Sequence, residues 1–187
     1  MGIFDFFSKN REHQFNKVEF REKKESELMK SLCLGIVGDF GRLLDDAGFD
    51  KPVRTLEIIM FAMFIITETY ELSKRGNKES ESLNIFHHDM FNYFANEHLI
   101  KNMAVDKNAI FEFEDKFYDT VGKRYAEYRQ HFKEDLNNPG TIYSNTLCAF
   151  MRYLFTEPIS DNDKQKILIP MALKFVEFCT GSLKSFK

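Results

Sequence analysis

The sequence contains no tryptophan and only three cysteines in 187 residues. The cysteines are far apart, odd in number and without a Cys-x-x-Cys pair, which excludes a disulfide framework and a zinc site built on such pairs. Cys33, Cys148 and Cys179 have apolar neighbours, so we expect small buried side chains in a reducing cytoplasm. The first residues also lack the order of charge, apolar stretch and small side chains typical of a secretory signal, which agrees with a cytoplasmic location.

A strong excess of charge of either sign is also missing. The formal net charge is −3 and the pI is about 6.0, whereas a general nucleic-acid-binding protein needs a basic face. We therefore expect no nucleic-acid partner. With 29% charged and 43% hydrophobic residues, the composition is typical of a globular chain rather than a disordered one.

The alternation of apolar and polar residues that indicates strands is not sustained anywhere, and neither an internal repeat nor a low-complexity tract is evident. Apolar residues instead recur at steps of three and four, for example over 28–43 and 110–132, and this spacing predicts amphipathic helices. The length is that of one domain. The sequence thus predicts an all-α fold, an irregular bundle of about six helices.

The longest apolar run predicts the centre of this bundle. Nine consecutive apolar residues, Ile58 to Ile66, lie between the acidic residues Glu57 and Glu68. A run without a polar side predicts a helix that is buried all round, and it is too short for a membrane span of about 20 apolar residues. We expect a central helix over 56–74, enclosed by a dry core because the chain has 21 Phe and 8 Met.

Residues 1–25 differ in pattern from the rest of the chain. A short apolar cluster is followed by a charged stretch with few apolar residues, which predicts an N-terminal arm that is partly helical or flexible. Residues 26–187 are then a single all-helical domain. The arm is a candidate for docking to a partner or a membrane surface, although it could also fold back onto the core. The docking residues that we predict are Ile3, Phe4, Phe6 and Phe7.

Glycine and proline residues lie within the predicted helices, where they affect helix stability and shape. Gly35, Gly38 and Gly41 cost a helix about 1 kcal/mol each relative to alanine, so we expect close packing of this face against the central helix. Residues 160–163 resemble a capping box, which predicts the start of the last helix. Pro170 should kink or split that helix.

Polar residues near the central helix give an alternative site. The pair His88-Asp89 resembles the core of the HD phosphohydrolase pattern, which implies a bound metal, but that pattern also needs an upstream histidine and the sequence offers only His13 besides His87. His87 and His98 are eleven residues apart, about 16 Å of helical rise, too far to share one ion. We predict no metal site, no catalytic residue and no cofactor. The alternative polar site consists of His87, His88, Asp89, Glu68 and Glu71.

Two classes of function remain open. Because no catalytic set is assembled, the first hypothesis is a non-catalytic, adaptor-like protein-interaction module that docks through its apolar N-terminus to a protein partner or a membrane surface; a homodimer is also compatible. The alternative is a small-molecule-binding protein or metal-dependent enzyme, with a pocket between helices lined by Phe and Met. In either case we expect Glu57, Glu68 and Glu71 to mark where the central helix reaches the surface.

Overall fold

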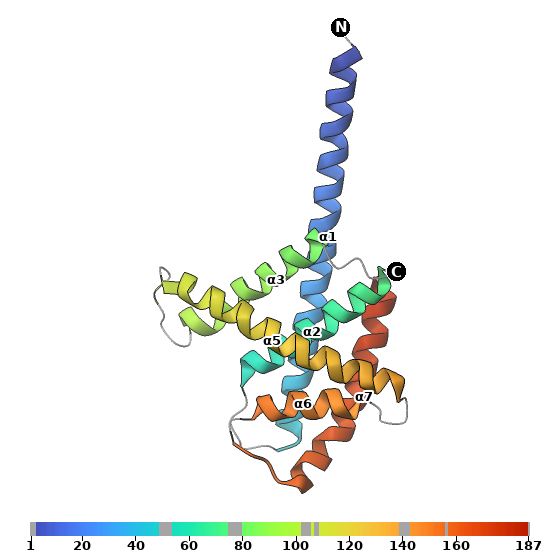
Figure 1. The fold of residues 1–187 in the computed structure, drawn as a ribbon. Helices are drawn as coiled ribbons and strands as arrows, with labels where there is room; N and C mark the ends of the chain where they lie inside the picture. Colours follow the sequence, from blue (N-terminus) through green and yellow to red (C-terminus); the bar gives the residue numbers. More distant parts are fainter. Residues whose placement is uncertain are drawn as a thin grey trace.

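The computed structural model of the protein is built from helices alone in the part of the chain that it describes. It describes residues 3–48, 54–74, 80–101, 106, 109–138, 143–155 and 157–186, with the backbone alone for residues 3–18, His98 and Phe111. The helices are α1 (Ile3–Asp46), α2 (Thr55–Ser73), α3 (Glu81–Phe94), the π-helical η1 (Ala95–Ile100), α5 (Ile110–Asn137), α6 (Ser144–Leu154) and α7 (Asp161–Ser185) (Figure 1). The predicted all-α bundle is confirmed.

Helix α2 lies at the centre of the bundle. It contacts α1, α3, α5, α6 and α7, and every residue from Glu57 to Tyr70 is buried. The uninterrupted apolar run explains this position, since a helix without a polar side must be covered on all sides. The predicted central helix over 56–74 is therefore confirmed, with its ends moved by one residue.

Aromatic rings join the surrounding helices to α2. The ring of Phe61, in α2, stacks on Phe150 of α6 with centroids 4.1 Å apart, and it also lies 5.9 Å from Phe40 of α1. Tyr128 of α5 and Phe175 of α7 are 5.2 and 5.6 Å away. Aromatic pairs of this geometry stabilise a fold by about 0.5–1.5 kcal/mol beyond the area that they bury. One side chain thus connects five helices.

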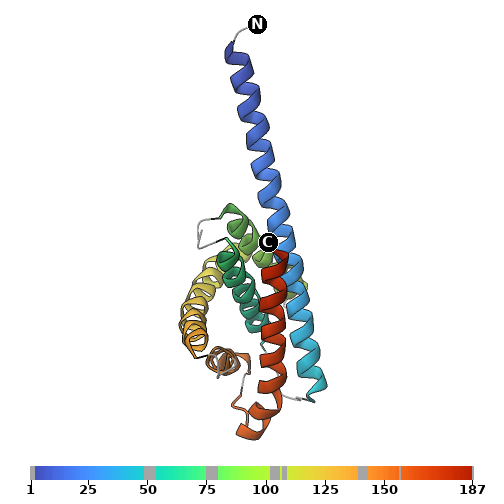
Figure 2. The ribbon, with the colours of Figure 1, turned by 90° about the vertical axis from the view of Figure 1, so that its right-hand side faces the viewer.

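Helix α1 has two halves with different surroundings. It is 44 residues long, about 66 Å at 1.5 Å per residue. Its C-terminal half packs against α2, α3 and α7 through a buried stripe of Met29, Cys33, Ile36, Phe40 and Leu44. Its N-terminal half extends well beyond the other helices, as both views show (Figures 1 and 2). The division of the chain at residue 25 into arm and domain stays a prediction.

The glycines of α1 lie on the side of the helix away from the core. No neighbouring atom lies within 4 Å of the position that a Cβ atom would take at Gly35, Gly38 or Gly41. At about 100° per residue these positions fall opposite the buried stripe, so the predicted packing of the glycines against α2 is wrong. The structure gives no compensation for their low helix propensity.

Two further expectations need correction, and one is confirmed. Helix α7 runs through Pro170, so the predicted split is wrong, whereas the kink stays a prediction. The helix continues because Pro170 is exposed and water can bond to the carbonyl left without an N–H partner. Cys148 is exposed, because it lies on the outer side of α6, whereas Cys33 and Cys179 are buried as predicted. The Ser160 hydroxyl accepts a 3.1 Å hydrogen bond from the N–H of Asp163, which confirms the predicted cap.

The exposed glycines lead to a stability prediction. Gly35→Ala and Gly38→Ala should each raise the free energy of unfolding by about 0.5–1 kcal/mol, because alanine fits a helix better and meets no neighbour at either position. Urea unfolding monitored by circular dichroism measures the change. Gly48→Ala is the matched control: its φ of 67° suits glycine, so this variant should lose stability. Destabilisation by Gly35→Ala or Gly38→Ala would contradict the prediction.

Candidate functional site

Glu25 lies at the point where α1 leaves the bundle. Its Oε2 accepts hydrogen bonds from the Tyr70 hydroxyl at 2.5 Å and the Ser82 hydroxyl at 3.2 Å. Its Oε1 accepts from Lys74 Nζ at 3.1 Å and Arg21 Nε at 3.2 Å. Burial alone would raise the pKa of Glu25, but the hydrogen bonds from Tyr70, Lys74 and Arg21 outweigh it and lower the pKa to about 2. This carboxylate joins α1 to α2 and α3, and so sets the direction in which the N-terminal half extends.

The acidic residues of α2 are paired with arginines of α5. Arg124 donates to both carboxylate oxygens of Glu57, from Nη2 at 2.9 Å and from Nε at 3.1 Å. Arg129 pairs with Glu68 and, at 3.3 Å, with Glu71. The side chains of Glu57 and Glu68 are only 5% and 12% exposed, so the expectation that they mark the surface is wrong. They are buried because α5 supplies a guanidinium to each.

His87, which is itself half-buried, belongs to a largely buried set of three polar groups on three helices. Its Nε2 lies 3.2 Å from Thr67 Oγ1 of α2 and 3.2 Å from the hydroxyl of Tyr125 of α5. Burial lowers the pKa of His87 to about 4, against a backbone hydrogen bond at Leu83 that raises it. Burial also raises the pKa of Tyr125 well above its ordinary value, with a smaller contribution from the charge of Glu68. All three groups are therefore uncharged at neutral pH.

The alternative polar site is brought together only in part. His87 lies in the buried set, and the group formed by Glu68, Glu71 and Arg129 is next to it through Tyr125. His88 is exposed and contacts Asn92 of its own helix at 3.1 Å. The predicted docking residues Ile3, Phe4, Phe6 and Phe7 lie on α1, but their side chains are outside the described residues.

The buried polar residues connect helices and present no reactive group to solvent. Sequence reasoning did not place Thr67, Tyr125 or Arg129 in a candidate site, since each lies within an apolar or mixed helix pattern without a motif. Within the described ranges, no group of three or more His, Cys, Asp and Glu side chains is placed to hold a metal ion. The hydrogen bonds and ion pairs of this network connect α2, α3 and α5, which is a structural role.

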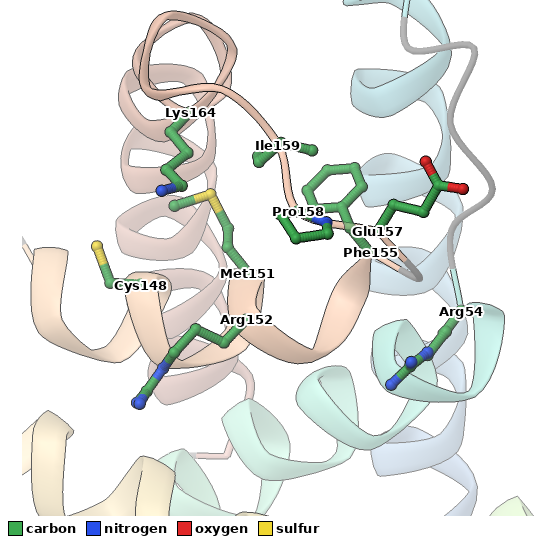
Figure 3. A pocket seen from close by; sticks show the side chains of 9 residues that line it. All are labelled: Arg54, Cys148, Met151, Arg152, Phe155, Glu157, Pro158, Ile159 and Lys164. Atoms are coloured by element: carbon green, nitrogen blue, oxygen red, sulfur yellow. The ribbon is translucent and has the colours of Figure 1, made fainter.

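Among the described residues, pockets open on the surface of the bundle. One, of about 600 Å³, lies between α6, Phe155, residues 157–159, the first turn of α7 and Arg54, which precedes α2 (Figure 3). Another, of about 620 Å³, lies between the C-terminal half of α1 and α7, where Leu43 and Leu173 are flanked by side chains of both charges. Both volumes are within the range of small-molecule sites.

Comparison with known proteins gives no match: no family model, curated protein or solved structure matches the chain. Across the residues that the structure describes, none of the helices is both long and apolar enough to cross a membrane. The class of protein that can be stated is an all-helical bundle with a Phe- and Tyr-rich core and one extended helix.

The half-buried His87 predicts a pH dependence of stability. The unfolded chain binds a proton on this ring below its ordinary pKa of 6.5, whereas the folded protein does so only below about 4. Stability should therefore fall as the pH drops through this window, with a contribution from His87 of about 2 kcal/mol at pH 5. Urea unfolding at pH 7 and pH 5 measures it. The loss should shrink in His87→Gln and persist in His88→Gln; an equal loss in both variants would refute this origin.

Glu25 predicts a second loss of stability, at more acidic pH. Its folded pKa of about 2 lies below the ordinary 4.5, so its contribution is present above pH 4.5 and is lost as the pH falls toward 2. At neutral pH, Glu25→Gln should cost about 1–3 kcal/mol, because four donors lose a charged acceptor. Glu27→Gln, an exposed neighbour on α1, is the control. Equal unfolding free energies for the two variants would show that the cluster contributes nothing.

Proposed function

We propose that this protein is a non-catalytic interaction module that binds a protein partner through the N-terminal half of α1. The observation that carries the proposal is the extension of this half beyond every other helix of the bundle (Figures 1 and 2). An isolated amphipathic helix is a common recognition element, because it can place its apolar side in a groove of another protein. Glu25 fixes the base of the helix, which reduces the entropy lost on binding.

The apolar residues of the extended half support this use. By the helical repeat, positions 4, 7, 15 and 18 continue the stripe that Met29, Cys33, Ile36 and Phe40 form within the bundle. These four positions hold Phe4, Phe7, Phe15 and Val18. The same side of one helix would thus serve the core in its C-terminal half and a partner in its N-terminal half.

The charge of this segment favours a protein surface over a lipid surface. Residues 9–25 contain six basic residues, Lys9, Arg11, Lys17, Arg21, Lys23 and Lys24, and four acidic ones, Glu12, Glu19, Glu22 and Glu25. Attraction to anionic lipid needs a polybasic segment, and alternating charges provide little of it. Binding to a protein groove lined by both charges has no such requirement. A reducing cytoplasm is the location that we propose, in agreement with three free thiols.

A substitution that keeps the helix tests the proposal. Replacing Phe4, Phe7, Phe15 and Val18 together by glutamine removes the apolar stripe while retaining helix propensity. The matched control replaces two exposed leucines of the bundle, Leu72 and Leu136, which are 53% and 49% exposed. Each immobilised protein is then incubated with a lysate of its source cells, and the retained proteins are quantified. We expect a protein retained by the native chain and the control to fall about tenfold or more on the quadruple variant.

Several outcomes would overturn the proposal. Identical retention by the quadruple variant and the control would remove the role of the stripe. Flotation of the native chain with phosphatidylcholine–phosphatidylglycerol vesicles, abolished by the quadruple variant, would identify a membrane surface instead. A dimer in light scattering that the quadruple variant dissolves would identify a second copy. Thermal unfolding of a chain lacking residues 2–20 should match that of the native chain, and a collapse would show that this segment belongs to the core.

A further inference from the structure

The pocket between α6 and α7 has an apolar interior. Met151, Phe155 and Ile159 line it, and they are 6%, 5% and 8% exposed in the folded chain. Pro158 and the exposed Cys148 complete its apolar and weakly polar wall. Figure 3 shows Met151, Phe155, Pro158 and Ile159 grouped in the middle of the lining. A preformed interior of this composition suits an apolar chain or ring.

The rim of the same pocket is basic. Arg54, Arg152 and Lys164 line it, against a single acid, Glu157. Figure 3 shows Lys164 and Arg152 on the left of the apolar group, above and below it, and Arg54 on its right. The pocket between α1 and α7 differs, because three acidic residues there balance three basic ones. The lining of the pocket between α6 and α7 thus has more basic than acidic residues, whereas the whole chain has a net charge of −3.

Two details bear on how much of this charge a ligand would meet. Arg152 pairs with Glu127 at 2.7 Å, and Lys164 pairs with the exposed Asp161 at 2.9 Å. Those carboxylates offset part of the positive potential of Arg152 and Lys164. Pairs between exposed groups are weak, at about 0–1 kcal/mol, so a ligand carboxylate can replace Glu127 or Asp161 at little cost. Arg54 is also the residue before α2, whose N-terminal N–H groups carry a partial positive charge. The basic rim and the helix end therefore act in the same direction.

We propose that this pocket binds a small amphipathic anion, a carboxylate attached to an apolar chain. The chain would lie against Met151, Phe155 and Ile159, and the carboxylate would lie at the basic rim, in the positive potential that Arg54 and Lys164 supply from opposite sides. Arginine and lysine donate charge-assisted hydrogen bonds to carboxylates, which supplies specificity for the anionic end. This site is independent of the proposed partner binding through α1, because it lies at the opposite end of the bundle (Figure 1).

Titration calorimetry with decanoate, used below its micellar concentration, is the first test. We expect saturable binding of one decanoate per chain and an affinity about tenfold or more lower for decyltrimethylammonium, which has the same chain and the opposite charge. The double variant Arg54→Glu with Lys164→Glu should weaken decanoate binding by about tenfold. The control, Lys133→Glu with Lys184→Glu, makes the same change in net charge on exposed residues that do not line the pocket and should alter affinity less than twofold.

Cys148 locates the ligand. It lines this pocket and is exposed, whereas Cys33 and Cys179 are buried, so iodoacetamide should modify Cys148 first in the folded protein. Saturating decanoate should slow that modification severalfold in the native chain and in the control, and far less in the double variant. Peptide mass spectrometry measures the rate at each cysteine. Arg54→Gln is a milder second variant, with the same expected direction, if circular dichroism shows that the double variant is unfolded.

Each of the following results would overturn a different part of the inference. Absence of decanoate binding, or equal binding of decyltrimethylammonium, would refute the preference for an anion. Decanoate binding that leaves the modification rate of Cys148 unchanged would place the ligand elsewhere. Equal affinity in the double variant and its control would show that Arg54 and Lys164 do not contribute. None of these results bears on partner binding through α1, which the substitutions at positions 4, 7, 15 and 18 test separately.

Discussion

The burial of α2 on every side is the constraint on which the rest of the structure depends. A helix with a continuous apolar run cannot lie at the surface, so the other helices must enclose it. Helices α1, α3, α5, α6 and α7 all contact it. The aromatic rings around Phe61 show how this enclosure is filled, since flat rings at several angles pack densely without polar atoms to satisfy.

Enclosing α2 also buries the acidic residues near its ends, and arginines of a neighbouring helix form ion pairs with them. Glu57 and Glu68 pair with Arg124 and Arg129 of the same neighbouring helix. A buried ion pair adds little net stability, but a buried charge without its partner is costly. If α5 slid along α2 by one turn, both carboxylates would lose their partners. The two pairs therefore fix the position of α5 more than they stabilise the fold.

The fold separates two surfaces that have different physical character. The N-terminal half of α1 extends from one end of the bundle, and the basic-rimmed pocket opens near the other (Figure 1). The first is an elongated surface whose position depends on hydrogen bonds to Glu25. The second is a concave site formed by α6, α7, Phe155 and residues 157–159. Neither of these two surfaces includes the polar network around His87, which links α2, α3 and α5.

Sequence periodicity by itself determined the helical class, the central helix and the buried stripe of α5 through Phe117, Tyr125 and Phe132, because local spacing records which side of a helix is apolar. Only the tertiary structure decided which neighbour each side meets. Glu57 is buried because Arg124 arrives from α5, 67 residues away along the chain. The same limit applies to the pocket, whose lining comes from four separate segments brought together by packing. Spacing along a helix carries no information about contacts between residues that are far apart in the sequence. Those contacts decide where the polar pairs, the exposed Cys148 and the pocket lie.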